Sequence, residues 1–206
     1  MHTIGDFENI IFDRGGVIFN VDYTKTQRAF EALGMQNVEE VYSQQQQQGL
    51  FDKFEKGEIT ASEFINALKS SCAPETTDDQ IRSAWNAMLL DFPVERLNFL
   101  GWLGDAHRLF LLSNTNEIHL KAFNEILFTT RGYHSLDPFF ERVYYSHELH
   151  MRKPEKELFE WALNENKLDA ENTLFIDDSE ANIIAADNLG IATIHILPGL
   201  EFTKLY

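Results

Sequence analysis

The chain has 206 residues, of which 33 are acidic and 17 are Lys or Arg, giving a formal net charge of -16 at pH 7. A charge of this sign argues against nucleic acid or an anionic membrane surface as a partner. Cys72 is the single cysteine, which excludes an intrachain disulfide, and we recognise neither a secretory leader nor an apolar run of membrane-spanning length. We therefore expect a cytoplasmic protein without membrane or nucleic-acid partners, whose oligomeric state the sequence does not reveal.

The first predicted strand is an apolar run, residues 10–12, that stops at Asp13 and is followed by Gly15 and Gly16. Because polar alternation is absent, the run suits a strand buried on both faces of a parallel sheet, whose carboxyl end is where such sheets bind ligands. The glycines let the backbone approach an anion closely. We interpret Asp13 as a covalent nucleophile, and the simpler alternative is a buried strand followed by an ordinary turn.

The next seventy or so residues carry apolar side chains at helical spacing. We expect helices over residues 24–33, over one or two stretches of 38–54 with a break near Gly49, over 62–71, and over 78–90. Gly34 suits a C-terminal cap of the first of these helices, and Thr60 or Ser62 suits the N-terminal cap of the third.

The only low-complexity segment is the glutamine run at residues 44–48, which we place on a helix. It is either a solvated helical face or a set of amides that reach a polyhydroxy substrate. The candidate specificity residues in this helical region are Gln45, Gln48, Glu55 and Trp85.

Strands and helices alternate again after Pro93, which implies right-handed βαβ units and a parallel sheet. The expected elements are a helix over 94–103, strands over 108–112 and 141–146, a helix over 155–166, a strand over 173–176, a helix over 180–189 capped by Ser179 and ended by Gly190, and a strand over 192–196.

Polar residues suited to phosphate chemistry follow four of these segments. In a parallel sheet, the strand ends lie at one edge, so we expect these residues to converge there. Taken singly, the lysine suits a surface position, the serine a helix cap and the aspartate pair an acidic first helical turn. The residues are Asp13, Ser113, Asn114, Lys153, Asp177 and Asp178.

This order of residues resembles the four motifs of the haloacid dehalogenase superfamily over nearly the whole chain. The matching segments are residues 12–17, 112–116, 152–154 and 175–179. The helical insert resembles the small cap of a subfamily of sugar-phosphate phosphatases. The runs at 113–116 and 54–59 are most similar to those of bacterial glucose-1-phosphate phosphatases and of the phosphatase half of soluble epoxide hydrolases.

The resemblance implies an α/β fold in which a Rossmann-like parallel-sheet core, residues 1–20 and 92–206, carries an inserted helical cap, residues 21–91. It also implies a Mg²⁺-dependent phosphatase in which Asp13 forms an aspartyl-phosphate that water then hydrolyses. The Asp13 carboxylate, the Gly15 backbone carbonyl and Asp178 would hold the ion. Hard oxygen ligands of this kind suit Mg²⁺, and Asp177 would be a second or water-mediated ligand.

The resemblance assigns further residues to the phosphate group and to catalysis. Ser113 and the backbone of Asn114 would hold phosphate oxygens, Arg14 would bind substrate, and Lys153 would balance the charge on the nucleophile and the phosphoryl group. Ser113 and Lys153 therefore join Asp13 as the expected catalytic residues.

One position departs from the usual pattern of the superfamily. Most of its phosphatases have a second Asp, the general acid and base, two residues after the nucleophile, where this chain has Gly15. The group of glucose-1-phosphate phosphatases is similar in lacking that carboxylate. We therefore expect a phosphatase for a small phosphorylated metabolite such as a sugar 1-phosphate.

Two other functions stay open at this point. A dehalogenase on the same scaffold would use Asp13 to displace halide, although the pair Asp177 and Asp178 would then have no metal to hold. A catalytically impaired binding or regulatory protein would have lost the acid-base residue, although Asp13, Lys153 and Asp178 are retained.

Three histidines lie close to the predicted motifs in the sequence. His147 and His150, near Lys153, suggest either a transition-metal site or, as we favour, a polar loop, because a third ligand is not nearby in the sequence. His119 follows the second motif, and we expect a solvated helical position for it rather than a place at the cap interface.

Overall fold

The computed structural model describes residues 3–40 and 49–206, so the predictions for residues 44–48, including Gln45 and Gln48, lie outside the described residues. Within the described part of the chain, five parallel strands form a sheet in the order β3-β2-β1-β4-β5. The strands are β1 (Asn9–Phe12), β2 (Arg108–Ser113), β3 (Arg142–Tyr145), β4 (Thr173–Asp177) and β5 (Ala192–His195). The predicted parallel α/β core is confirmed.

Strand β1 lies in the middle of the sheet, with all four of its residues buried. Phe12 pairs in register with Leu111 of β2 and with Ile176 of β4. One step further along the chain, the Asp13 N–H donates to the carbonyl of Ile176 at 2.8 Å. This register brings Asp13 level with Asp177 at the carboxyl edge of the sheet.

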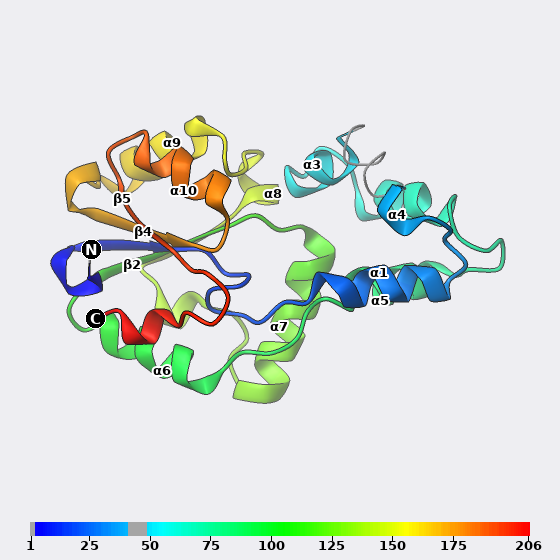
Figure 1. Ribbon diagram of the computed structural model, residues 1–206, viewed down its shortest axis with the longest axis horizontal. Coiled ribbons are helices and arrows are strands. Elements are labelled where there is room, and N and C mark those ends of the chain that lie inside the picture. The colour runs from blue at the N-terminus through cyan, green and yellow to red at the C-terminus, as the bar shows by residue number, and fades with distance from the viewer. Residues whose placement is uncertain (1–2, 41–48) are drawn as a thin grey trace.

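Helices cover both faces of the sheet, with α9 and α10 on one side and α6 on the other (Figure 1). Alternate residues of β1 enter different clusters of the core, because successive side chains of a strand point to opposite faces. Ile10 and Phe12 pack with Leu100 of α6, whereas Ile11 packs with Phe159 of α9. The helices of this part are α6 (Val94–Leu103), α7 (Glu117–Arg131), α8 (Ser146–Leu149), α9 (Lys156–Asn166) and α10 (Glu180–Asp187), and short 3-10 turns lie at Ile4–Asp6, Asp137–Phe139, Ala170–Asn172 and Phe202–Lys204.

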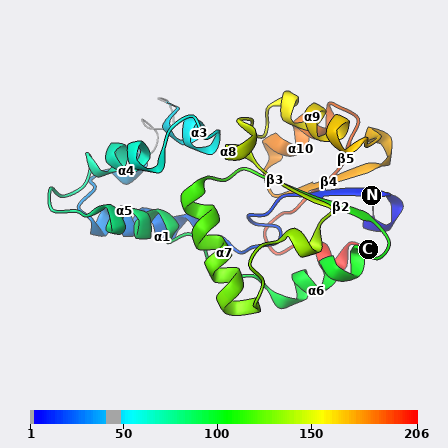
Figure 2. The same cartoon turned by 180° about the vertical axis from the view of Figure 1, so that it is seen from behind.

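The described helices between β1 and α6 lie beyond the carboxyl edge of the sheet, as both views of the ribbon show (Figures 1 and 2). They share a separate cluster of buried apolar residues, which Ile118 of α7 joins. We call this segment the helical insert; its predicted boundaries at residues 21 and 91 stay a prediction. Its described helices are α1 (Tyr23–Ala32), α3 (Leu50–Glu55), α4 (Ala61–Lys69) and α5 (Asp78–Asn86).

Capping explains where two of these helices begin. Thr60 and Thr77 each accept a hydrogen bond from the backbone N–H three residues on, while the side chains of Glu63 and Gln80 bond back to the cap residues. Such reciprocal bonds satisfy donors that a helix N-terminus leaves unpaired. Of the two cap residues predicted for α4, Thr60 is therefore the correct one.

The predicted end of the helix over 78–90 is wrong, because α5 stops at Asn86. The following residues pair instead with the segment that leaves the core. The Asp22 N–H donates to the Met88 carbonyl at 2.9 Å, and the Leu90 N–H donates to the Asn20 carbonyl at 3.1 Å. The two chain crossings between the core and the insert thus run side by side as an antiparallel pair.

Two smaller predictions about the helices also need correction. The Ser179 side chain makes no capping hydrogen bond to α10, which ends at Asp187 rather than at residue 189. The Ser179 N–H donates instead to the Asp177 carboxylate, so this turn holds a side chain at the edge of the sheet.

No helix in the described part of the chain combines the length and apolar character needed to cross a membrane.

Candidate active site

A buried lysine joins two carboxylates at the carboxyl edge of the sheet. The Lys153 ammonium donates to Asp13 Oδ1 at 2.6 Å and to Asp177 Oδ2 at 2.7 Å. Lys153 is 0% exposed, which is rare for a lysine unless its charge is paired. The structure therefore brings together three of the predicted site residues, from the turn after β1, from β4 and from the loop before α9.

The Asp177 carboxylate is fully engaged by protein donors. Its Oδ1 accepts from the Ser179 N–H at 2.7 Å and from Asn182 Nδ2 at 3.1 Å, and its Oδ2 accepts from Asn182 Nδ2 at 3.0 Å as well as from Lys153. These bonds fix the side chain and orient the ammonium toward Asp13. Sequence reasoning had missed Asn182, which lies in the first turn of α10.

Burial and neighbouring charges shift the pKa values of Asp13 and Lys153 in opposite directions. Burial raises the pKa of Asp13 to about 7, although the Lys153 charge opposes the rise. Burial alone would lower the pKa of Lys153, but the charges of Asp13 and Asp177 reverse this and raise it. A cation placed beside these carboxylates would favour their ionised forms.

Three carboxylates form the only group of at least three metal-binding side chains among the described residues. Oxygen atoms of Asp13, Asp177 and Asp178 lie within 4.8 Å of one another, and Asp178 is the accessible member. One ammonium accompanies these three acids, so the donor set is negative, compact and composed of hard oxygen atoms. This set fits Mg²⁺, which prefers such ligands.

Gly16 leaves the space that Asp178 occupies. A Cβ added to Gly16 would lie 2.1 Å from Asp178 Oδ2, and the φ angle of Gly16 is +73°, a region that other residues rarely adopt. A Cβ on Gly15 would meet only ordinary contacts, at 3.8 Å from Val21 Cγ1 and 3.9 Å from Asp13 Oδ2. The structure thus explains why the second glycine is needed for this geometry.

We expect Gly16→Ala to displace Asp178 and to cost about 1–3 kcal/mol in the free energy of unfolding through backbone strain. Activity should fall with it. Gly15→Ala is the matched control and should retain the wild-type stability and activity, because its Cβ has room. Urea unfolding measures the stability, and activity measured over a Mg²⁺ titration shows the effect on the site. Equal losses in the two variants would contradict the role given to Gly16.

The Asn114 side chain holds the segment that carries Lys153. Asn114 Nδ2 donates to the Lys153 carbonyl at 2.8 Å, and the Lys153 N–H donates to Asn114 Oδ1 at 2.9 Å. Sequence reasoning had considered only the backbone of Asn114. Ser113 is buried at the end of β2, and its hydroxyl donates to the Asn114 carbonyl at 3.5 Å.

Arg14 is buried next to Asp13. Its Nη2 donates to Thr115 Oγ1 at 2.7 Å, and its guanidinium lies over the Phe123 ring at 3.9 Å from the centroid. Its Nη1 has no hydrogen-bond partner within the described residues. Burial lowers the pKa of Arg14 from its ordinary value.

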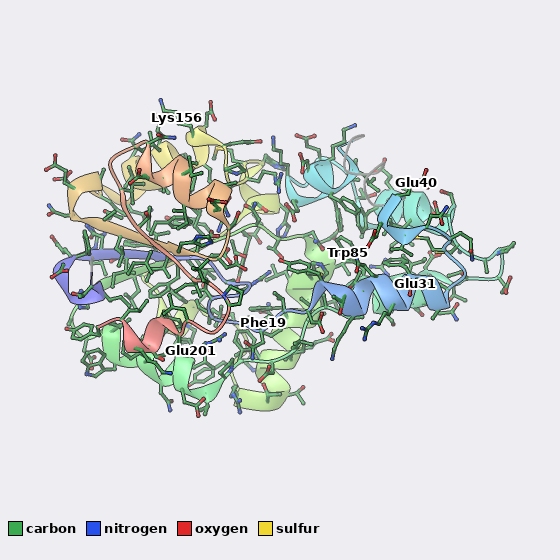
Figure 3. All side chains as sticks on the ribbon, viewed as in Figure 1. Phe19, Glu31, Glu40, Trp85, Lys156 and Glu201 are labelled. Carbon is green, nitrogen blue, oxygen red and sulfur yellow. The ribbon has the colours of Figure 1, made fainter. Side chains whose placement is uncertain are left out.

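A cavity of about 540 Å³ opens where the helical insert meets the core. Asp13, Lys153 and Asp178 line it from the core. Trp85, from α5 of the insert, lines it as well, and Figure 3 places this side chain between the two parts of the molecule. The volume suits a small molecule.

The predicted solvated position of His119 is wrong, since the residue is 7% exposed and lines this cavity. Its imidazole stacks on Trp85, with ring centroids 4.8 Å apart, and its Nδ1 lies 2.9 Å from Asn86 Oδ1. Both partners come from α5, a contact between distant segments that local spacing does not reveal. Burial, together with the nearby Arg14 charge, lowers the pKa of His119 to about 3.

This depressed pKa predicts a stability change with pH. His119 has an ordinary pKa of 6.5, so below that pH the unfolded chain takes up a proton that the folded protein refuses. Relative to His119→Phe, the wild-type free energy of unfolding should fall by about 1.4 kcal/mol per pH unit as the pH drops below about 6.5. Urea unfolding of both proteins across this range measures the gap. A gap that does not change with pH would contradict the buried neutral imidazole.

His147 and His150 do not form a metal site among the described residues, because the carboxylate cluster is the only group with a third ligand there. His150 Nδ1 lies 2.7 Å from the Lys56 carbonyl, and a Cβ on Gly57 would lie 2.3 Å from the His147 carbonyl. His147 lies inside α8 and His150 directly follows it, so the favoured prediction of a polar loop is wrong for His147, and these contacts join the insert to α8.

Arg152, which precedes Lys153 in the chain, makes a further contact between the core and the insert. Its Nε donates to Glu55 Oε2 at 2.9 Å, and its Nη1 donates to Asp52 Oδ1 at 2.7 Å. Glu55, one of the predicted specificity residues, also lines the cavity. Burial raises its pKa, against the opposing charge of Arg152. We call this set of contacts the Arg152 clasp.

Comparison with known proteins identifies the family. The chain is 30% identical over 197 residues to a D-ribitol-5-phosphate phosphatase of Bacteroides thetaiotaomicron, a match that covers 96% of this chain and 95% of that protein. The chain belongs to the haloacid dehalogenase-like hydrolase family. The family's own sequence pattern, described as Haloacid dehalogenase-like hydrolase, matches residues 132–196.

Solved structures of this haloacid dehalogenase (HAD) family share the fold over nearly their whole lengths. A HAD family enzyme of Bacteroides thetaiotaomicron, in complex with magnesium and inorganic phosphate, has a TM-score of 0.89 at 36% identity, covering 97% of this chain and 99% of that chain. A predicted HAD-like family hydrolase from Porphyromonas gingivalis has a TM-score of 0.84 at 32% identity, covering 95% and 93%. The superfamily and fold class expected from the sequence are therefore confirmed.

Proposed function

We propose that this hydrolase is a Mg²⁺-dependent phosphatase for a small phosphorylated metabolite. The observation that carries the proposal is the Lys153 ammonium, buried between Asp13 and Asp177 beneath a cavity that Asp178 also lines. The names of the relatives support it, since one is a phosphatase of a polyol phosphate and another was crystallised with magnesium and phosphate.

Asp13 is the nucleophile in this proposal. Its Oδ1 is held by Lys153, which leaves Oδ2 to attack phosphorus, so that an oxygen–phosphorus bond forms and the ester oxygen departs. Water then attacks the phosphorus of the aspartyl-phosphate and frees Asp13. Lys153 balances the negative charge that gathers during both steps.

Mg²⁺ would be held by Asp13, the Gly15 carbonyl and Asp178, and when bound it supplies positive charge to the phosphoryl oxygens. Asp177 acts indirectly in this scheme, because protein donors already occupy both of its oxygens. Ser113 and the Asn114 backbone are proposed to hold the phosphate. Arg14, whose Nη2 donates to Thr115 and whose Nη1 is fully buried, is proposed to attract the substrate through its charge.

The helical insert is proposed to act as the cap that selects the leaving group. Trp85 of α5 and Glu55 of α3 line the cavity, and the Arg152 clasp ties α3 to the loop that carries Lys153. A sugar 1-phosphate and a polyol phosphate both fit a cavity of about 540 Å³.

A panel of phosphorylated metabolites, assayed with and without Mg²⁺, tests the proposal. We expect phosphate release that depends on Mg²⁺ and that is strongest for sugar or polyol phosphates. A 2-haloacid belongs in the same panel. Halide release without phosphatase activity would favour the dehalogenase, and no turnover of any compound would favour a binding protein.

The missing carboxylate at Gly15 predicts how the leaving group affects the rate. General acid catalysis is typically worth about 10²–10⁴ in rate, so its absence should slow esters with poor alkoxide leaving groups. Sugar 1-phosphates, whose anomeric oxygen is a better leaving group, should react faster, and aryl phosphates faster again. The next acidic residue along the chain, Asp22, could be considered as an alternative acid, but its carboxylate caps α1 by accepting from the Thr24 N–H at 3.0 Å.

The measurement is kcat/KM over leaving groups of similar size but different pKa. Gly15→Asp, which has room for its Cβ, should flatten the dependence by rescuing the poor leaving groups, provided that the variant still binds Mg²⁺. A flat dependence already present in the wild-type enzyme would show that another group supplies the proton.

A further inference from the structure

The His119 imidazole is held in one orientation at the cavity wall. Its ring stacks on Trp85 with only 7° between the planes, and its Nδ1 lies 2.9 Å from Asn86 Oδ1. These partners lie next to each other on α5, whereas His119 belongs to α7. A side chain fixed by two contacts from the opposite helix is suited to recognition of a ligand, because little side-chain entropy is lost on binding.

The bond to Asn86 also fixes the tautomer. The Asn86 Oδ1 atom can only accept, so His119 Nδ1 carries the proton and donates it. Since the ring is neutral, its Nε2 presents a lone pair and no proton. Nε2 bonds to no other described residue, and it is not among the fully buried unpaired atoms, so it keeps contact with the cavity that His119 lines.

The insert contributes mainly apolar side chains to the cavity that His119 lines. Phe51, Trp85 and Met88 of the insert line the same cavity. The guanidinium of Arg14 lies over Phe123, one helical turn after His119 on α7, but its Nη2 is taken by Thr115 and its Nη1 is fully buried. His119 Nε2 therefore stands as an accessible acceptor on the wall of this cavity.

We propose that His119 determines specificity by accepting a hydrogen bond from a hydroxyl of the leaving group. The inference rests on the proposed phosphatase function and narrows it to phosphate esters of polyhydroxy compounds. A carboxylate or a second phosphate at this place would meet the Nε2 lone pair without a proton to share, which disfavours binding. An analogue that lacks the hydroxyl would leave the acceptor unpaired, and such losses weaken binding in the transition state.

The test compares a pentitol 5-phosphate with its set of monodeoxy analogues, and it includes p-nitrophenyl phosphate as a probe without a hydroxyl. All assays contain Mg²⁺. For the wild-type enzyme, kcat/KM should fall about tenfold for one of the deoxy analogues, the loss expected for one hydrogen bond. The quantity compared between variants is the ratio of kcat/KM for the parent ester to kcat/KM for that deoxy analogue. His119→Phe keeps an aromatic ring against Trp85 but has no acceptor, so this ratio should fall to about one.

Two further variants make the result specific. Asn86→Leu removes the bond that holds the proton on Nδ1, so the ratio should decrease while the imidazole stays in place. It also serves if His119→Phe does not fold. Glu125→Gln changes an exposed residue of the same helix and should keep the wild-type ratio.

The inference is overturned if the wild-type enzyme hydrolyses every deoxy analogue as fast as the parent ester, or if both His119→Phe and Asn86→Leu keep the wild-type ratio. Hydrolysis of p-nitrophenyl phosphate without hydrolysis of any pentitol phosphate overturns this inference alone. No hydrolysis of any phosphate overturns the proposed function, and this inference with it.

Discussion

Replacing Asp13 with Asn is expected to leave the fold intact and to lower kcat/KM by roughly 10³-fold or more, as losses of a catalytic nucleophile do. The amide has the shape of the carboxylate and can still accept a hydrogen bond from the Lys153 ammonium, which now lies 2.6 Å from Asp13 Oδ1. It cannot form an acyl-phosphate. The loss should therefore fall on kcat, with circular dichroism and thermal unfolding close to those of the wild type.

Asp105→Asn is the matched control, because it makes the same chemical change at an exposed position between α6 and β2. It should keep wild-type activity. An Asp13→Asn enzyme within tenfold of the wild type would refute the nucleophile assignment. A variant that is inactive because it is unfolded would be recognised by its lost thermal transition.

Removing divalent metal with EDTA is expected to lower turnover by roughly 10²-fold or more, a loss in keeping with the several kcal/mol that a catalytic ion supplies. Oxygen atoms of three aspartates lie within 4.8 Å of one another, with only the Lys153 ammonium between two of them. A phosphate dianion added to this group would be strongly repelled. Excess Mg²⁺ should restore the activity in full.

Binding of the ion can be followed without turnover, since a ligand that binds only the folded protein raises its apparent stability. Mg²⁺ should raise the thermal midpoint of the wild type and should do so less in Asp178→Asn. Lys121→Ala, an exposed change on α7, should respond as the wild type does. Full phosphatase activity in metal-free protein would remove the basis for Asp178 as a ligand.

The local features of the core were predictable from the sequence. Uninterrupted apolar runs before Asp13 and Asp177 indicated buried parallel strands, and the helix over 94–103 has the bounds of α6. Because parallel strands end at one edge, the convergence of Asp13, Lys153 and Asp177 could be anticipated as well. Expectations about cellular location and nucleic acid stay predictions.

Contacts between distant segments were not predictable in the same way. The residues next to His119 in the sequence gave no sign that its ring stacks on Trp85. The backbone pairing of residues 20 and 90, which follows the early end of α5, was not visible in the helical spacing either. The reciprocal bonds between Asn114 and Lys153 also join different loops. Each of these features depends on how segments far apart in the chain meet in the fold, which periodicity within one segment does not encode.

The central claim is that Asp13 carries the phosphoryl group during turnover. The most direct test is an acid quench of the Mg²⁺-loaded enzyme during turnover, followed by borohydride reduction and peptide mass spectrometry. The account predicts homoserine in place of the aspartate at Asp13, because borohydride reduces an acyl-phosphate, and it predicts no such change in Asp13→Asn or without substrate. Rapid turnover with an unmodified Asp13 peptide, or with the label on another residue, would contradict it.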